Sequence, residues 1–177
     1  VMQNAFALSF VQVMYGAPNG IYRMSPNIDG LVQTSNNIAR VVVGEGAYSV
    51  QCLTRSAVDS EKMDLANALS ALFGIWGASI SFGGSYPGWT PKPDASIVKI
   101  MRELYAQLHP GEQPHVNACH AGLECGILGA NYPSMEMISF GPTIQGAHSP
   151  DERVSISSVG KFWSYLLATL KHIPVQA

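Results

Sequence analysis

The sequence has 177 residues, of which 47% are hydrophobic and only 12% are charged, and its formal net charge is −2. The ten Lys and Arg residues form no basic run that could follow a phosphate backbone, so no nucleic-acid partner is expected. No apolar stretch reaches the ~20 residues needed to cross a bilayer, so no membrane partner is expected either. The low share of charge, compared with about 25% in an average domain, predicts a surface that other polypeptide covers.

The first half of the sequence predicts helices and strands of one small domain. Residues 2–15 place apolar side chains at helical intervals. Residues 31–43 and 47–55 are rich in β-formers and flank a Gly-Glu-Gly turn, which indicates a hairpin. A second helix is expected from Ser60, with that serine as its cap, and residues 78–82 alternate like a short strand. This order matches a split βαββαβ unit that lacks its first strand.

The missing strand suggests that the first domain is incomplete. The sequence begins with Val1 instead of Met, and no residues ahead of the first predicted helix could form a strand. We therefore expect the chain to begin inside a larger protein.

The second half predicts another incomplete α/β layer. Residues 83–94 are dense in Gly and Pro, which indicates a domain boundary. The elements expected beyond it are a helix capped by Asp94 and ending at Leu108, strands at 115–118 and 135–140, a helix starting near Glu124, and a final amphipathic helix over 159–170. Strands that alternate with helices in this way are typical of α/β folds.

A loop before the final helix contains His148, followed closely by Asp151 and Glu152. Loops at strand ends are where α/β folds place their sites, and an imidazole held by nearby carboxylates could bind a metal ion. A histidine that only satisfies a local turn explains the same residues, and the spacing alone favours that simpler interpretation.

Residues 119–126, Cys-His-Ala-Gly-Leu-Glu-Cys-Gly, form a second candidate site. If a helix starts here, His120 and Glu124 lie one turn apart, and free amides around Gly122 could receive an anion. A tight turn with its two cysteines as small buried groups fits equally well. A metal site made only of this segment is disfavoured, because adjacent Cys and His side chains cannot easily converge on one tetrahedral ion.

Arg55 stands near the end of the second hairpin strand. Its guanidinium could bind a carboxylate bidentately. A solvated arginine at a strand end is the ordinary alternative, so both interpretations stay open.

The three cysteines are Cys52, Cys119 and Cys125. Their odd number and their spacing match neither a Cys-x-x-Cys zinc pair nor a disulfide framework. We expect reduced thiols in a cytoplasmic protein.

Four segments together closely resemble aminoacyl-histidine dipeptidases, which are cytosolic, carnosinase-like zinc metallopeptidases. They are Cys-Leu-Thr-Arg-Ser at 52–56, Ser-Tyr-Pro-Gly-Trp at 85–89, His-Ala-Gly-Leu-Glu-Cys-Gly at 120–126, and the stretch from Ser139 to Glu152. The resemblance extends over most of the chain and implies the C-terminal portion of such an enzyme. The implied fold is α+β or α/β: an incomplete ferredoxin-like lid (dimerisation) domain over 1–88, then the C-terminal part of an α/β catalytic domain over 89–177.

The resemblance also implies roles for individual residues. His148 occupies the place of a zinc-binding histidine, Arg55 and Gly122 match substrate-binding positions, and His120 and Glu124 are further candidates for substrate binding. The general base and the other metal ligands belong to an N-terminal half, so no catalytic residue is expected in this chain.

The function implied for the full-length protein is hydrolysis of Xaa-His dipeptides at two zinc ions, or at other divalent metals, in a homodimer formed through the lid. A shared metal-bound water would be deprotonated by a glutamate and attack the peptide carbonyl. The isolated chain, without the missing N-terminal half, is expected to be inactive. The alternatives are a non-catalytic, self-associating fragment and an unrelated binding module.

Overall fold

The computed structural model describes residues 3–120 and 124–173, and it has a mixed α/β fold, as predicted. The chain divides into two compact units: Val1–Pro91 with Ala118–Pro133, and Lys92–Asn117 with Ser134–Ala177. The assignment of residues 1–88 to a lid and 89–177 to a catalytic domain stays a prediction. Among the described helices, none has the length and apolar character required to span a membrane.

The first unit contains an antiparallel sheet of β1 (Gly20–Met24), β2 (Val32–Gly44) and β3 (Ala47–Ser56), in that order. The predicted hairpin is confirmed. Glu45 and Gly46 connect its strands with φ angles of 52° and 76°, and positive φ at both central residues is the geometry that two-residue hairpin turns favour. The sequence did not predict β1, since all five of its residues are exposed and no buried face marks it.

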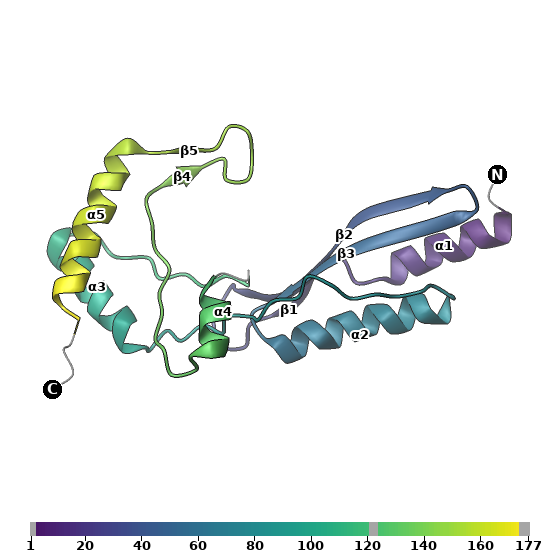
Figure 1. The fold of residues 1–177 in the computed structure, drawn as a ribbon, viewed down its shortest axis with the longest axis horizontal. Helices are drawn as coiled ribbons and strands as arrows, with labels where there is room; N and C mark the ends of the chain where they lie inside the picture. Colours follow the sequence, from purple (N-terminus) through teal and green to yellow (C-terminus); the bar gives the residue numbers. More distant parts are fainter. Residues whose placement is uncertain (1–2, 121–123, 174–177) are drawn as a thin grey trace. The chain divides into compact units, whose positions relative to one another are not determined.

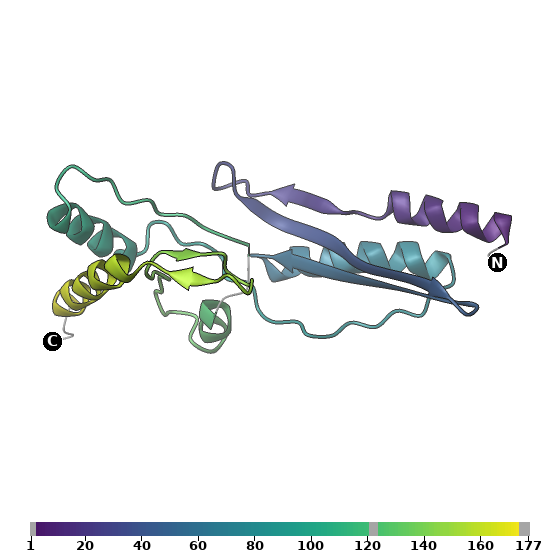
Figure 2. The same ribbon diagram turned by 90° about the horizontal axis from the view of Figure 1, so that it is seen from above.

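Helices α1 (Asn4–Gly16) and α2 (Asp59–Ile75) confirm the two predicted helices and pack beside the hairpin (Figures 1 and 2). Ala17, Leu65, Leu69 and Phe73 form the buried core between them, and Leu65 is completely inaccessible. The predicted cap at Ser60 is wrong. The helix begins at Asp59, so the capping position falls on Val58, two residues before Ser60, and Val58 makes no side-chain capping bond.

Four aromatic rings pack together where α1, the turn end of the hairpin and the C-terminal end of α2 meet. Trp76 lies 4.5 Å from Tyr48, 5.1 Å from Phe6 and 5.5 Å from Phe10 between ring centroids. Its indole N–H donates a hydrogen bond of 3.2 Å to Ser9 Oγ. Aromatic contacts of this kind add stability beyond the apolar area that they bury.

The predicted strand over 78–82 is wrong, because these residues belong to no hydrogen-bonded ladder. The segment runs back alongside β3 (Figure 2), and residues 77–86 and β3 line opposite sides of a groove of about 750 Å³. A strand requires a neighbour on its hydrogen-bonding side. Here the described chain leaves a groove instead.

The second unit contains α3 (Ser96–Leu108), α5 (Ile156–Lys171) and a small hairpin of β4 (Ile144–Gln145) and β5 (Arg153–Val154). The two helices were predicted, but Ala95, not Asp94, occupies the N-cap position of α3. The strands predicted at 115–118 and 135–140 are wrong, since both segments lack ladder partners in the described chain. The hairpin was not predicted, because two-residue strands are too short to show alternation.

The apolar face of α5 is only partly covered. Tyr165 packs toward α3 and donates a hydrogen bond of 2.6 Å to the Met101 carbonyl. Trp163, Leu167 and Leu170 on the same helix remain 57%, 41% and 55% exposed. A helix face of this kind normally packs against another element.

Candidate functional site

The segment that contains His120 belongs to the first unit, and very close backbone contacts hold the helix that follows it. It leads into α4 (Glu124–Asn131), which confirms the helix predicted near Glu124. A Cβ atom at Gly126 would lie 2.4 Å from the Pro87 carbonyl oxygen, and one at Gly88 would lie 2.6 Å from the Ala57 carbonyl oxygen. Glycine at both positions therefore allows backbone to approach backbone.

His120 is hydrogen-bonded to the sheet. Its Nε2 lies 2.9 Å from Ser35 Oγ, and Ser35 is the direct partner of Arg55 across β2 and β3. Cross-strand partners present their side chains on the same face of a sheet. Burial and, to a smaller extent, the positive charge of Arg55 lower the pKa of His120, which favours the neutral imidazole.

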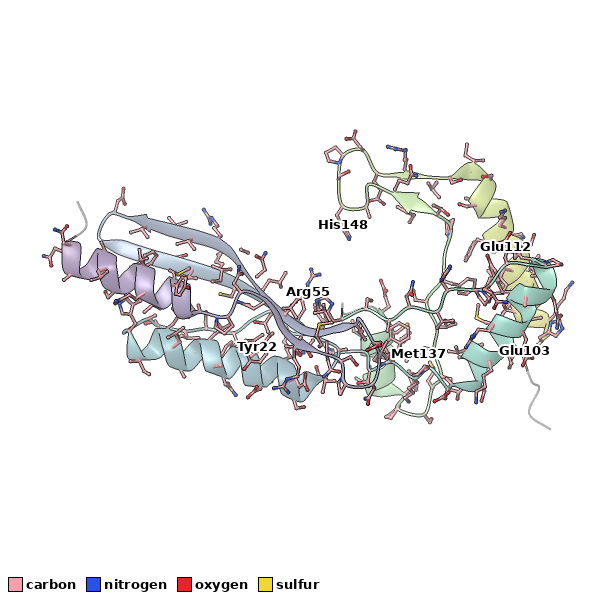
Figure 3. All side chains as sticks on the ribbon, turned by 180° about the vertical axis from the view of Figure 1, so that it is seen from behind. Tyr22, Arg55, Glu103, Glu112, Met137 and His148 are labelled. Atoms are coloured by element: carbon pink, nitrogen blue, oxygen red, sulfur yellow. The ribbon has the colours of Figure 1, made fainter. Side chains whose placement is uncertain are left out.

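Arg55 and His120 both line the 750 Å³ groove, at the end where Ser56 and Tyr86 also contribute. Arg55 lies on β3, where it is solvent-exposed (Figure 3). No described acidic side chain pairs with its guanidinium. An exposed guanidinium without a counter-ion is suited to bind a carboxylate group of a ligand.

The structure does not test the substrate-binding roles predicted for Gly122 and Glu124. Gly122 lies outside the described residues, so its contact with substrate stays a prediction. Glu124 is exposed at the start of α4. Whether Glu124 and His120 share one helical turn stays a prediction, because residues 121–123 between them are not described.

A polar network that the sequence did not predict lies beside this site. The Glu61 carboxylate accepts hydrogen bonds from Gln33 at 2.7 Å, from Thr34 at 2.9 Å and from Arg23 at 2.9 Å. Thr34 is fully buried and also hydrogen-bonded to Ser56 at 2.8 Å. The bond from Gln33, more than any other contact, lowers the pKa of Glu61. The network ties the start of α2 to the strand ends next to Arg55.

His148 lies in the loop between β4 and β5, with its side chain exposed to solvent (Figure 3). Its φ angle is 63°, a conformation that histidine adopts more readily than most residues. Its backbone N–H donates to a Glu152 carboxylate oxygen at 2.9 Å, and Ser149 Oγ donates to the Gly146 carbonyl at 2.7 Å. The loop is thus organised by its own hydrogen bonds, and the imidazole is free to reach a partner outside it.

His148 provides a single candidate metal ligand. Within residues 3–120 and 124–173, no three His, Cys, Asp or Glu side chains gather closely enough to hold a metal ion. Catalytic zinc takes three protein ligands, and structural zinc takes four. The described chain alone therefore does not fit a zinc centre. Its three cysteines, Cys52, Cys119 and Cys125, are free thiols.

Residues 13–172 match the family model of peptidase family M20/M25/M40. The chain belongs to this family. A family relative, the cytosol non-specific dipeptidase of Escherichia coli (strain K12), is 40% identical over 168 residues, which are 95% of this chain and 34% of that protein. The crystal structure of aminoacylhistidine dipeptidase from Vibrio alginolyticus aligns with a TM-score of 0.84 at 40% identity, over 99% of this chain and 36% of that one. The resemblance to such dipeptidases predicted from the sequence is confirmed.

A more distant structure shares the fold. Aminopeptidase PepT from Bacillus cereus aligns with a TM-score of 0.70 at 15% identity, over 93% of this chain and 44% of that one. The chain spans about a third of the length of the two dipeptidases that it matches at 40% identity.

Proposed function

We propose that this chain is the C-terminal portion of a zinc dipeptidase that hydrolyses Xaa-His dipeptides. In this proposal His148 contributes one metal ligand, and Arg55, Gly122 and the candidate residues His120 and Glu124 contribute to substrate binding. The observation that supports it best is the exposed His148 imidazole on an internally hydrogen-bonded loop, in a chain of the M20/M25/M40 family.

The metal ligands other than His148 must then come from polypeptide outside residues 1–177, as must the general base. When bound, two zinc ions or other divalent metals would supply an activated water for peptide hydrolysis. Within this chain, Arg55 would orient the dipeptide by its carboxylate, which holds the scissile bond in a productive position. The chain by itself would be inactive.

Uncovered surfaces in both units support a partner from the same protein. In the first unit, β3 is an edge strand of the described sheet and faces the groove that residues 77–86 line on its other side. Exposed strand edges readily pair with further polypeptide. We propose that a strand from the missing N-terminal half lies in this groove, and that the exposed apolar face of α5 packs against the same half.

Self-association is the second candidate role. The same unpaired edge could pair with a second copy, as in a homodimer formed through the lid or in a non-catalytic fragment that associates with itself. Sedimentation of the 177-residue chain and of the full-length protein separates these cases. A monomeric full-length protein at high concentration would contradict the homodimer, whereas a monomeric chain would contradict only the self-associating fragment.

The cytosolic location is proposed from the name of the Escherichia coli relative, which is a cytosol dipeptidase. Free thiols at all three cysteines agree with a reducing compartment. Fractionation of the source cells tests it, and recovery of the protein outside the cytosol would contradict it.

The central experiment is His148→Ala in the full-length protein. Loss of a direct ligand should lower the metal content and reduce kcat/KM on Xaa-His dipeptides by more than about 100-fold, which exceeds the usual effect of residues that only support a ligand. His172→Ala is the matched control, since that imidazole contacts the Ala168 carbonyl of its own helix at 2.8 Å. A His148→Ala protein with normal metal content and turnover would refute the ligand assignment.

A further inference from the structure

We propose that Ser35 is a positioning residue: it orients the His120 imidazole so that its Nδ1–H and the Arg55 guanidinium bind the same carboxylate of the peptide substrate. This inference deepens the proposed function and rests on it. It adds a residue that the sequence did not single out.

The placement of Ser35 follows from the register of the hairpin. Ser35 pairs directly with Arg55 across β2 and β3, and its Oγ lies 2.9 Å from His120 Nε2. The side chains of Ser35 and Arg55 therefore project from the same face of the sheet. Ser35 and His120 are half-buried, and the contact joins positions 85 residues apart in sequence. The imidazole is therefore held at a fixed place beside Arg55.

The direction of the Ser35–His120 hydrogen bond decides what the imidazole presents to a ligand. A neutral imidazole has one N–H donor and one acceptor nitrogen. Burial and the Arg55 charge lower the pKa of His120 and so favour this neutral form. If the Ser35 hydroxyl donates to Nε2, the proton lies on Nδ1, which can then donate to an anion. The opposite tautomer would leave Nδ1 with a lone pair, which a carboxylate would repel.

The charge of the groove identifies the ligand group as an anion. Arg55 is exposed and has no ion-pair partner among the described residues, and it lines the groove together with His120. A guanidinium and an N–H donor at neighbouring positions complement the two oxygens of a carboxylate. A dipeptide carries such a group at its C-terminus.

The experiment compares Ser35→Ala with Ser35→Thr in the full-length protein. Threonine keeps the hydroxyl and suits a strand. Ser60→Ala, at an exposed position in the first turn of α2, is the matched control for loss of a serine hydroxyl. The substrates are an Xaa-His dipeptide and its C-terminal amide, which lacks the carboxylate.

We expect Ser35→Ala to raise KM for the dipeptide by about 10-fold, the usual size for one hydrogen bond to a charged group. Its kcat should stay within about twofold, because carboxylate binding is the same in the ground state and the transition state. Its kinetics on the amide should not change. Ser35→Thr and Ser60→Ala should behave like the wild type. Equal losses on acid and amide, or no loss on either, would overturn the inference and leave the dipeptidase assignment intact.

A second measurement does not depend on turnover. The ¹⁵N chemical shifts of the His120 imidazole in the full-length protein report its tautomer. We expect the Nδ1–H form in the wild type and in Ser35→Thr, and a shift toward the Nε2–H form in Ser35→Ala. An Nε2–H tautomer in the wild type would overturn the inference. By contrast, failure of the proposed function would appear as a His148→Ala protein with full activity.

Discussion

Replacing Gly126 with alanine tests whether α4 is positioned by its contact with residues 87–88. The new Cβ would lie 2.4 Å from the Pro87 carbonyl oxygen and 3.3 Å from that of Gly88, whereas ordinary contact begins at 3.4 Å. The helix must therefore move away by roughly 1 Å, and overpacking of this kind costs about 1–3 kcal/mol. The gain in helix propensity from Gly to Ala is about 1 kcal/mol. We expect a net destabilisation of about 0–2 kcal/mol.

The functional effect should be larger than the effect on stability. His120 lies four residues before the start of α4 at Glu124, so a displaced helix is expected to shift this imidazole, which we propose to contact the substrate. Misplacement of binding groups by about 1 Å can cost about 100-fold in rate. Steady-state kinetics of the full-length Gly126→Ala protein on an Xaa-His dipeptide should show kcat/KM reduced by about 10-fold to 100-fold.

Gly160→Ala is the matched control, since it makes the same change within α5. A Cβ at Gly160 meets nothing within 4 Å, so only the helix propensity changes. We expect it to be more stable by about 0.5–1 kcal/mol in urea unfolding, with unchanged kinetics. If Gly126→Ala matched Gly160→Ala in both urea midpoint and kcat/KM, the contact between α4 and residues 87–88 would not position the site.

Two further predictions concern stability. Trp76→Ala should lower the free energy of unfolding by about 2–3 kcal/mol, because the indole packs on Tyr48, Phe6 and Phe10. The loss is smaller than for a fully buried tryptophan, since the side chain is only half-buried. Urea unfolding measures this change, and a value below about 0.5 kcal/mol, typical of surface sites, would contradict the prediction. Folding lowers the pKa of Glu61, chiefly through the hydrogen bond from Gln33, so the ionised carboxylate stabilises the folded state. This contribution to the free energy of unfolding is fully present above about pH 4.3, the ordinary pKa of glutamate, and is lost as the pH falls through the lower pKa of the folded state. Urea midpoints measured across this range should fall less in Glu61→Gln than in the wild type, and identical slopes would contradict the prediction.

The elements predicted correctly from the sequence are those whose signal is local. The helical spacing of Leu65, Leu69 and Phe73 reflects one buried stripe of α2, and that stripe is the core of the first unit. The turn at Glu45 and Gly46 fixes the hairpin by its own backbone geometry. Such patterns need no knowledge of the rest of the molecule.

The candidate site could be predicted only in part. Local sequence marked Arg55, Gly122 and His148 as candidates, but it fitted ordinary structural explanations at least as well. Their roles were implied only by a resemblance that spans several segments. Ser35 gave no local signal, because its contact with His120 depends on how distant parts of the chain fold together. The hydrogen bonds from Gln33 and Thr34 to Glu61 are equally non-local, and a glutamate in the first turn of a helix is commonplace.

The strand error at 78–82 and the exposed face of α5 have one physical explanation. Alternation within 78–82 indicates which side chains would face a core. A strand also needs a neighbouring strand for its hydrogen bonds, and sequence periodicity does not show whether that neighbour is present. Likewise, the apolar stripe of α5 is helical as predicted, yet Trp163 and Leu170 are more than half exposed. In both places the local pattern specifies a buried surface that the described chain does not bury. If these surfaces pack against further polypeptide in the full-length protein, the sequence would show buried patterns at the edge of the sheet and along α5 that the described chain does not bury.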